Sequence, residues 1–230
     1  MSVKVENVEK VYRLGEIPVN ALKGVSMELQ KGEFVAVMGP SGSGKTTLLN
    51  LIGALDKPTK GKIYIDGKDL TTLKEKGLTN LRRHTIGYIF QFYNLIPVLS
   101  AFENVELPML IAGTPKKERE ERARQLLASV GLTDRADHRP DELSGGEQQR
   151  VAIVRALVNK PSVVLADEPT GDLDTKTGTE VMHALRDLSS SEEATVIVVT
   201  HDPIVADLAT KVFEMRDGKI IRCRQNNHTL

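Results

Sequence analysis

Residues 34–47 read Phe-Val-Ala-Val-Met-Gly-Pro-Ser-Gly-Ser-Gly-Lys-Thr-Thr, an apolar run that passes directly into a glycine-rich segment. The apolar run predicts a buried strand, and the segment after it matches the pattern G-x-x-x-x-G-K-[ST] from Gly39 to Thr46. Glycines let consecutive backbone N–H groups turn toward one anion, and a helix that follows adds the partial positive charge of its N-terminus. A plain glycine turn needs no Lys-Thr pair, so the stretch predicts a phosphate-binding loop.

Each residue of this loop is a candidate ligand contact. We expect Lys45 to reach the β- and γ-phosphates of a nucleotide, and the Thr46 hydroxyl to ligate Mg²⁺, a hard cation that prefers oxygen. The candidate phosphate-binding set is Gly39, Pro40, Ser41, Gly42, Ser43, Gly44, Lys45, Thr46 and Thr47.

A second apolar run, Val163–Ala166, ends in the adjacent acids Asp167 and Glu168. Open α/β sheets hold their ligands at the carboxyl ends of strands, and neighbouring residues of an extended chain point in different directions. We therefore expect Asp167 to hold Mg²⁺ through its water shell and Glu168 to orient and polarise an attacking water. Alone, such a strand more often precedes a solvated loop; the phosphate-binding loop favours the catalytic interpretation.

The rest of the chain predicts an α/β fold, because continuous apolar runs separated by helical patterns are typical of a buried parallel sheet. The mixed charges of Lys116–Leu127 permit i,i+4 pairing and predict a solvated helix face that ends at Gly131. Helices are expected between about Ser100 and Leu157 and from about Thr175 to Ser189. Strands are expected at Val3–Val11, Val25–Leu29, Phe34–Met38, Lys62–Ile65, Val163–Ala166 and Thr195–Thr200, with a last hairpin across Asp217-Gly218.

Composition limits the possible environments and partners. The chain has 230 residues, 40% hydrophobic and 27% charged, in the range of ordinary globular proteins. Lys plus Arg equals Asp plus Glu, 31 against 31, so we expect no nucleic-acid partner held by net charge. Cys223 is the single cysteine, which fits a reducing cytoplasm. Apolar stretches such as Thr195–Thr200 are far shorter than the roughly 20 residues of a membrane-spanning helix, so we expect no direct membrane insertion.

The segment Leu143-Ser-Gly-Gly-Glu147 leads into a helical run. Ser144 with Glu147 three residues later is a capping box, which starts many helices that bind nothing. The two glycines beside the cap favour a second interpretation, since they leave the N-terminal amides bare and allow a phosphate to approach.

In these motifs and their order the sequence resembles the ABC ATPase family. The resemblance covers nearly the whole chain and is carried by Tyr12, the loop Gly39–Thr46, Gln91, the segment Leu143–Glu147, the acids Asp167 and Glu168, Gly171-Asp-Leu-Asp174 and His201. It implies a P-loop NTPase core with a mainly parallel sheet, an antiparallel β subdomain and an inserted helical subdomain. The core would comprise residues 1–90 and 159–230, and the helical subdomain residues 91–158.

The resemblance also implies a role for each matching residue. Two chains would bind head to tail around two ATP molecules, as an ATP-dependent homodimer. Tyr12 would stack on adenine, unless it is a strand aromatic in the core. Gln91 would touch Mg²⁺ or the attacking water, unless it is an ordinary loop amide. His201 would contact the γ-phosphate, although an isolated histidine at a strand end is more often a core hydrogen-bonding group.

The partner chain would supply the remaining contacts. Ser144, Gly145 and Gly146 would hold the γ-phosphate of the ATP bound on the other chain, and Asp174 would lie along the dimer seam. Asp172 departs from the Gly-Asn usual in the branch that the sequence most resembles, which serves lipoprotein release and macrolide export.

Membership of that branch would give the protein a transmembrane permease subunit as partner, at the cytoplasmic face of the membrane. The exposed apolar residues expected at Phe92–Leu95 would form the docking groove for that subunit, unless they are core packing. An importer ATPase, a non-transport ABC protein and a P-loop small-molecule kinase are the alternatives. The last has no use for Leu143–Glu147.

Overall fold

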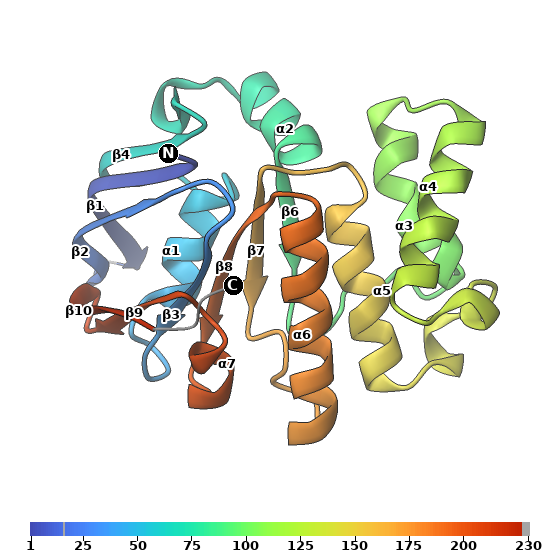
Figure 1. Ribbon diagram of the computed structural model, residues 1–230. Helices are drawn as coiled ribbons and strands as arrows, with labels where there is room; N and C mark the ends of the chain where they lie inside the picture. The colour runs from blue at the N-terminus through green and yellow to red at the C-terminus, as the bar shows by residue number, and fades with distance from the viewer. Residues whose placement is uncertain (16, 227–230) are drawn as a thin grey trace.

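The computed structural model describes residues 1–15 and 17–226 of the chain. A six-stranded sheet lies at its centre (Figure 1), with the strand order β10-β9-β3-β8-β7-β6. Every neighbouring pair is parallel except β9 and β10, which confirms the predicted α/β class. The strands are β3 (Phe34–Met38), β6 (Ile86–Ile89), β7 (Val163–Asp167), β8 (Thr195–Thr200), β9 (Lys211–Arg216) and β10 (Lys219–Gln225).

Alternate residues of the central strands face opposite sides of the sheet, as strand geometry requires. Val35, Val163 and Ile197 pack on one side with helix α1 (Lys45–Ile52) and with a second sheet. Val164 and Val198 pack on the other side with helices α5 (Gly145–Leu157) and α6 (Thr175–Ser191). The central strands are therefore buried on both faces, which is why their sequences are continuous apolar runs.

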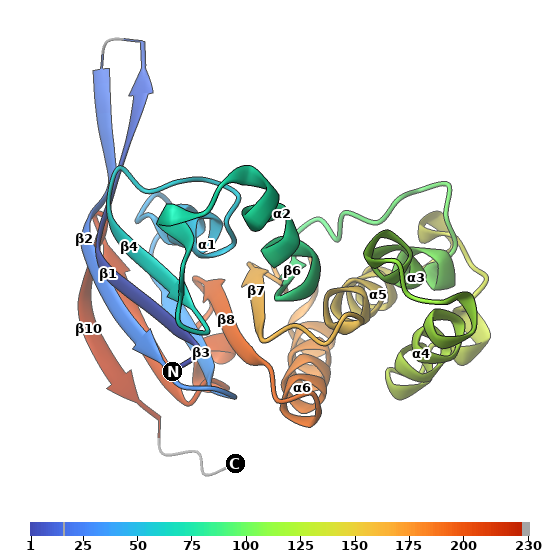
Figure 2. The same ribbon diagram turned by 90° about the horizontal axis from the view of Figure 1, so that it is seen from above.

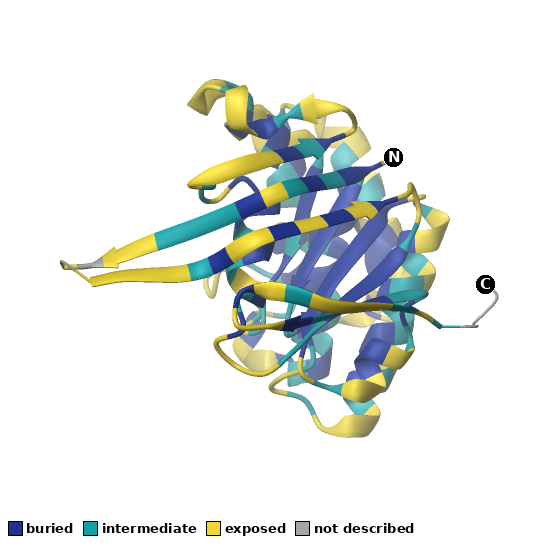
Figure 3. Ribbon diagram, turned by 90° about the vertical axis from the view of Figure 1, so that its left-hand side faces the viewer, coloured by how far each residue is buried: buried dark blue, intermediate teal, exposed yellow. Residues whose placement is uncertain are grey.

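The second sheet is antiparallel, with the order β2-β1-β4-β5. Its strands are β1 (Val3–Leu14), β2 (Ile17–Leu29), β4 (Lys60–Ile65) and β5 (Lys68–Asp69). The hairpin of β1 and β2 is longer than predicted and extends beyond the body of the molecule (Figure 2). Its outer part is largely exposed (Figure 3), so β2 lacks a buried face there.

Helices α3 (Ala101–Ala112), α4 (Lys116–Ser129) and α5 confirm the predicted helical segment. They pack around an apolar cluster of their own that includes Val105, Leu127 and Val154. The charged face of α4 is exposed and carries a Lys116–Glu120 pair at 3.6 Å, as predicted. The division of the chain into a core and a helical subdomain of residues 91–158 stays a prediction.

The remaining helices connect these layers. They are α2 (Glu75–His84), α7 (Pro203–Asp207) and three short 3₁₀ helices at Leu70–Thr72, Thr133–Arg135 and Pro140–Glu142. None of the helices within residues 1–15 and 17–226 combines the length and apolarity needed to cross a bilayer.

Candidate functional site

Parallel strands bring their carboxyl ends to one edge of the central sheet. Met38 of β3 pairs with Thr200 of β8, and Val199 of β8 pairs with Asp167 of β7. Ile89 of β6 pairs with Ala166. The residues that follow these strands, Gly39, His201, Glu168 and Gln91, are therefore collected along the same edge, which in open α/β sheets is the ligand-binding edge.

The glycine-rich loop joins β3 to α1 at this edge. Gly44 caps α1 with φ 102°, a conformation that favours glycine, and no side chain caps the helix. The N-terminal amides of α1 are thus left for an external acceptor. The Lys45 ammonium is nearly buried and donates to the carbonyl oxygens of Gly39 at 2.8 Å and Pro40 at 3.1 Å. The loop has the geometry of a preformed anion site with one positive charge fixed above it.

Thr46 and Asp167 bring a hydroxyl and a carboxylate together at this edge. The Thr46 hydroxyl donates to Asp167 Oδ1 at 3.1 Å. Burial raises the pKa of the Asp167 carboxyl and the negative charge of Glu168 adds to the rise, while the Thr46 hydroxyl and the Lys45 ammonium oppose it. A cation bound here would offset that cost of ionisation. The pair therefore fits Mg²⁺, which proteins hold with one or two carboxylates together with substrate phosphates.

Glu168 lies between the His201 imidazole and the Lys45 ammonium. Its carboxylate is 3.0 Å from His201 Nδ1, accepts from the His201 backbone N–H at 3.3 Å, and lies 3.8 Å from Lys45 Nζ. Glu168 adopts φ 46°, a left-handed conformation that costs energy for a residue with a side chain and is typical of functional sites. The His201 side chain is 68% exposed, so the alternative of a core histidine is wrong.

Gln91 lies against the loop that follows β7. A Cβ atom added to Gly171 would lie 2.9 Å from Gln91 Nε2 and 3.1 Å from its Cδ. A side chain at this position would push the end of the flexible Gln91 side chain aside. The Gln91 amide therefore lies against Gly171, in the loop that follows β7.

Tyr12 lies on β1, and its phenol lies close to Thr47 in the first turn of α1. Its ring is 37% exposed, so the alternative of a core aromatic is wrong. Partial burial raises the pKa of the phenol, the Asp56 carboxylate adds to the rise, and the Thr47 hydroxyl opposes it. The phenol donates to Asp56 Oδ2 at 2.9 Å. The ring is therefore tied at its hydroxyl and partly open to solvent.

Ser144 does not join this cluster within one chain. It forms the predicted capping box, with Glu147 N–H donating to Ser144 Oγ at 3.3 Å and Ser144 N–H donating to Glu147 Oε2 at 2.8 Å. Helix α5 packs on β6 and α6, and strands β8 and β7 separate β6 from β3 in the sheet. The first turn of α5 is therefore displaced from the glycine-rich loop of its own chain.

The two glycines beside Ser144 have a packing reason that the sequence did not reveal. A Cβ atom at Gly146 would lie 2.5 Å from Thr177 Cγ2, and one at Gly145 would lie 2.9 Å from Tyr93 Oη. Both glycines allow close approach of α5 to its neighbours, in addition to leaving its amides bare. Asp174 caps α6, accepting from the backbone N–H groups of Lys176 and Thr177 at 3.1 Å each.

Arg155 is a further residue of this region that the motifs did not single out. Its guanidinium donates to the carbonyl oxygens of Tyr93 at 2.7 Å and Asn94 at 2.5 Å, and burial lowers its pKa to about 10. Tyr93 and Asn94 are both left-handed, with φ 58° and 49°. Arg155 thus clamps a strained bend just after Gln91. Its signal in the sequence is a lone arginine in the apolar run Val151–Leu157.

A groove of about 440 Å³ lies beside this bend. It is lined by residues of α2, β6, α3 and α5, which include Arg83 and Ile111, and by Phe90 and Asn94 of the loop after β6. The predicted docking segment is divided: Phe92 is 72% exposed, whereas Leu95 packs against the helical cluster. For Leu95, core packing is therefore the correct interpretation.

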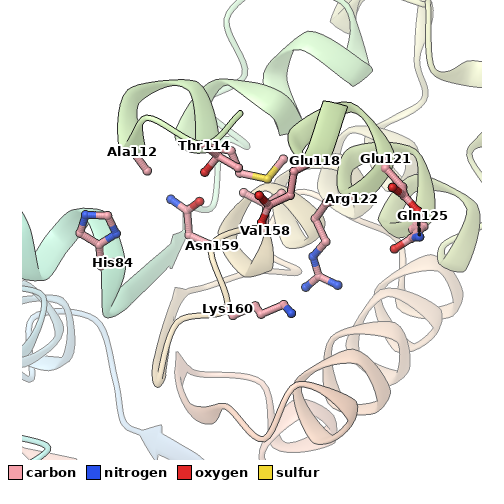
Figure 4. Close-up of a pocket in the computed structure, with 11 residues that line it drawn as sticks. His84, Ala112, Thr114, Glu118, Glu121, Arg122, Gln125, Val158, Asn159 and Lys160 are labelled. Carbon is pink, nitrogen blue, oxygen red and sulfur yellow. Dashed lines mark hydrogen bonds between the residues drawn. The ribbon is translucent and has the colours of Figure 1, made fainter. Parts of the chain in front are cut away.

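A second hollow of about 410 Å³ lies between α2, α3, α4 and the end of α5 (Figure 4). Its charged side chains have both signs: Glu118, Glu121, Arg122 and Lys160 line it. Glu121 accepts from Gln125 at 3.4 Å, and Arg122 pairs with Glu192 at 2.7 Å. None of the predicted site residues lines it. This hollow is separate from the sheet edge that collects Gly39, Glu168 and His201.

Comparisons with known proteins agree with this arrangement. Residues 22–171 match the ABC transporter family. The chain is 54% identical to an uncharacterized ABC transporter ATP-binding protein of Thermotoga maritima, over 93% of this chain and 91% of that protein. It is 50% identical to the macrolide export ATP-binding/permease protein MacB of Brucella melitensis, over 95% of this chain but 34% of that protein.

The solved structures agree as well. The fold is similar to the cassette MJ0796, a dimer in a post-hydrolysis state bound to ADP and Pi, with a TM-score of 0.89 and 47% identity. The match covers 99% of this chain and 100% of that chain, and the Methanocaldococcus jannaschii protein is named an uncharacterized ABC transporter ATP-binding protein.

Proposed function

This chain belongs to the ABC transporter family of ATP-binding proteins, and from that premise we propose which of its residues bind and hydrolyse ATP and how the ATPase is coupled to a membrane subunit. The family is an ATPase family, and the matching cassette structure holds ADP and Pi. The observation that carries the residue assignment is the collection of Lys45, Thr46, Asp167, Glu168 and His201 at one sheet edge.

The phosphate end of ATP would bind at the N-terminus of α1. The backbone N–H groups at the start of α1, which no side chain caps, would donate to the phosphate oxygens, and Lys45 would neutralise charge on the β- and γ-phosphates. Thr46, Asp167 and Gln91 would hold Mg²⁺ directly or through water. When bound, Mg²⁺ supplies charge neutralisation on the transferring phosphoryl group.

Hydrolysis needs a positioned water and a proton acceptor. Glu168 would accept the proton of that water, because its carboxylate is held at the strand end by His201 and lies next to Lys45. His201 would contact the γ-phosphate through the ring nitrogen that does not face Glu168. Gln91 would contact the bound phosphate. A shift of Gln91 would then move the bend after β6, whose Tyr93 carbonyl accepts from Arg155.

The adenine end would bind against Tyr12, whose exposed ring lies beside the phosphate-binding segment. The rest of the site would come from a second chain, head to tail. Ser144, Gly145 and Gly146 of that chain would present the amides of α5 to the γ-phosphate, and Asp174 would lie on the seam between the chains. The dimeric state of the similar cassette MJ0796 supports this proposal.

The partner at the membrane would be a transmembrane permease subunit, which would place this chain at the cytoplasmic face of the membrane. The groove beside Asn94 supports this proposal, since it combines apolar residues with a bend linked to Gln91. The similarity to MacB favours export or lipoprotein release over import or a non-transport role. Asp172, which stands where that branch usually has Asn, is given no role.

The direct test is Glu168→Gln, which keeps the shape of the side chain but removes its ability to accept a proton. We expect the steady-state ATPase rate to fall by roughly 10²-fold or more, while ATP affinity stays near that of the unmodified protein. Glu180→Gln, on the exposed face of α6, is the matched control and should keep full activity. Near-normal turnover of Glu168→Gln would exclude Glu168 as the base.

A further inference from the structure

Tyr12 is held by a polar network that joins three segments of the chain. Asp56, in the turn after α1, accepts from the Tyr12 phenol through Oδ2 at 2.9 Å and from Lys10 Nζ through Oδ1 at 2.7 Å. Lys10 also donates to the Lys57 carbonyl at 2.8 Å, and the Lys57 backbone N–H donates to Asp56 Oδ1 at 2.6 Å. Asp56 thus has a partner on each carboxylate oxygen. None of these partners is among the candidate phosphate contacts of Gly39–Thr47.

The network determines which face of the Tyr12 ring is free. Lys10 Nζ lies over the ring, 4.8 Å from its centroid, and the Lys10 side chain is only 12% exposed. An ammonium held in this way occupies one face of the ring through a cation–π contact. A planar base can therefore stack only on the opposite face.

The same turn links the ring to the phosphate-binding helix. The backbone N–H groups of Leu55 and Asp56 donate to the Asn50 carbonyl in the last turn of α1, at 2.9 and 3.4 Å. On the other side, Thr59 is hydrogen-bonded to β1 twice: its N–H donates to the Glu9 carbonyl at 2.8 Å, and its hydroxyl accepts from Val11 N–H at 3.0 Å. Asp56 therefore lies in a short, doubly anchored connection between α1 and the strand that carries Tyr12.

We propose that Asp56 and Lys10 are positioning residues that hold the Tyr12 ring at a fixed distance and orientation from the phosphate-binding loop, so that adenine stacks on the face opposite Lys10. The proposal rests on the proposed role of Tyr12 in binding adenine. A phenol fixed at its hydroxyl has less conformational freedom to lose when a base binds, which raises affinity for the base without touching the phosphates.

The test compares a ligand that has a base with one that has none. Asp56→Ala, Tyr12→Phe, their double variant and Tyr12→Ala are measured for binding of ATP and of inorganic tripolyphosphate, with KM and kcat for ATP. We expect Asp56→Ala and Tyr12→Phe each to weaken ATP binding about three- to tenfold, as for one lost hydrogen bond. Tripolyphosphate affinity and kcat at saturating ATP should stay constant.

The double variant should bind ATP no more weakly than Asp56→Ala, because Asp56→Ala already removes the hydrogen bond that Tyr12→Phe removes. Glu6→Ala is the matched control. It removes a different lysine-paired acid, located on β1, and should leave the binding of ATP and of tripolyphosphate unchanged. Tyr12→Phe deletes a single oxygen atom. It therefore tests the same hydrogen bond even if Asp56→Ala does not fold.

Equal weakening of ATP and tripolyphosphate binding in Asp56→Ala would mean that Asp56 supports the phosphate loop and would overturn the proposal. So would additive losses in the double variant. If Tyr12→Ala weakens ATP binding but Asp56→Ala and Tyr12→Phe do not, Tyr12 binds the base and the positioning role is wrong. If Tyr12→Ala leaves ATP binding unchanged, the adenine role of Tyr12 fails and the inference fails with it.

Discussion

The Lys45 ammonium shows how much a single residue of the loop contributes before any ligand arrives. It is bound to the Gly39 and Pro40 carbonyls and lies 3.8 Å from Glu168, so its position is fixed by the protein. A charge fixed in advance loses little conformational entropy on binding phosphate and acts in a partly water-excluded site. The residue is thus both a structural donor and the loop's source of positive charge.

Replacing Lys45 by alanine should therefore weaken ATP binding itself. We expect a loss of roughly ten- to a hundredfold, the range for a hydrogen bond to a charged group. Titration with a fluorescent ATP analogue measures the loss, and circular dichroism checks that the variant is folded. Lys31→Ala, at an exposed lysine paired with Glu193, is the control. Unchanged affinity together with unchanged turnover would mean that the loop is not the phosphate site.

Residues could be predicted from the sequence where a motif fixes their neighbours along the chain. Asp167 and Glu168 were predictable because an apolar strand ends just before them. Long-range contacts carry no such signal. Lys10 and Asp56 are 46 positions apart, and Arg155 reaches Tyr93 across 62 positions, so neither network could be deduced from spacing.

At the scale of elements, the strongly apolar segments were predictable and the less apolar ones were not. Strand β6 has only four residues and contains Gly87, where a Cβ atom would lie 2.3 Å from the Ala156 carbonyl oxygen. The requirement for glycine here comes from packing against α5, which the local sequence does not reveal. Helix α2 buries only Leu78 and Leu81 and is otherwise polar, and for that reason no helix was predicted there.

The bend after β6 is the element that we expect to contact the membrane subunit. Asn94 lines the groove and its carbonyl is held by Arg155, so a helix inserted there would press on the segment that carries Gln91. Asn94→Cys, placed in a Cys223→Ser background because Cys223 is exposed, should crosslink to the permease in the intact complex purified from membranes.

Glu28→Cys, on the exposed face of β2, serves as the control for this crosslink and should give no permease adduct. If Asn94→Cys captures no membrane subunit while reagent labels it efficiently, the groove is not the docking site. Capture by both positions alike would indicate non-specific contact.

At the scale of the whole molecule, the proposed ATP site has two halves that lie apart within one chain. The glycine-rich loop follows β3, whereas the first turn of α5 lies beyond β6, and the hydrophobic clusters that hold α1 and α5 lie on opposite faces of the sheet. Each half presents the N-terminus of a helix with positive potential. Two such surfaces repel each other until a polyphosphate lies between them, so dimerisation should depend on ATP and reverse with ADP.

The composite site can be tested by combining two inactive chains. Lys45→Ala disables the phosphate loop, and Ser144→Arg blocks the first turn of α5, so each homodimer has no intact site. Head-to-tail pairing of one chain of each kind creates one site with Lys45 and Ser144 both intact. ATPase activity should therefore peak near equal amounts of the two variants. Glu168→Gln should elute as a dimer with ATP and as a monomer with ADP, because ADP lacks the γ-phosphate that α5 would contact. If mixing restores no activity and Glu168→Gln also stays monomeric with ATP, Ser144 does not complete the site of a second chain.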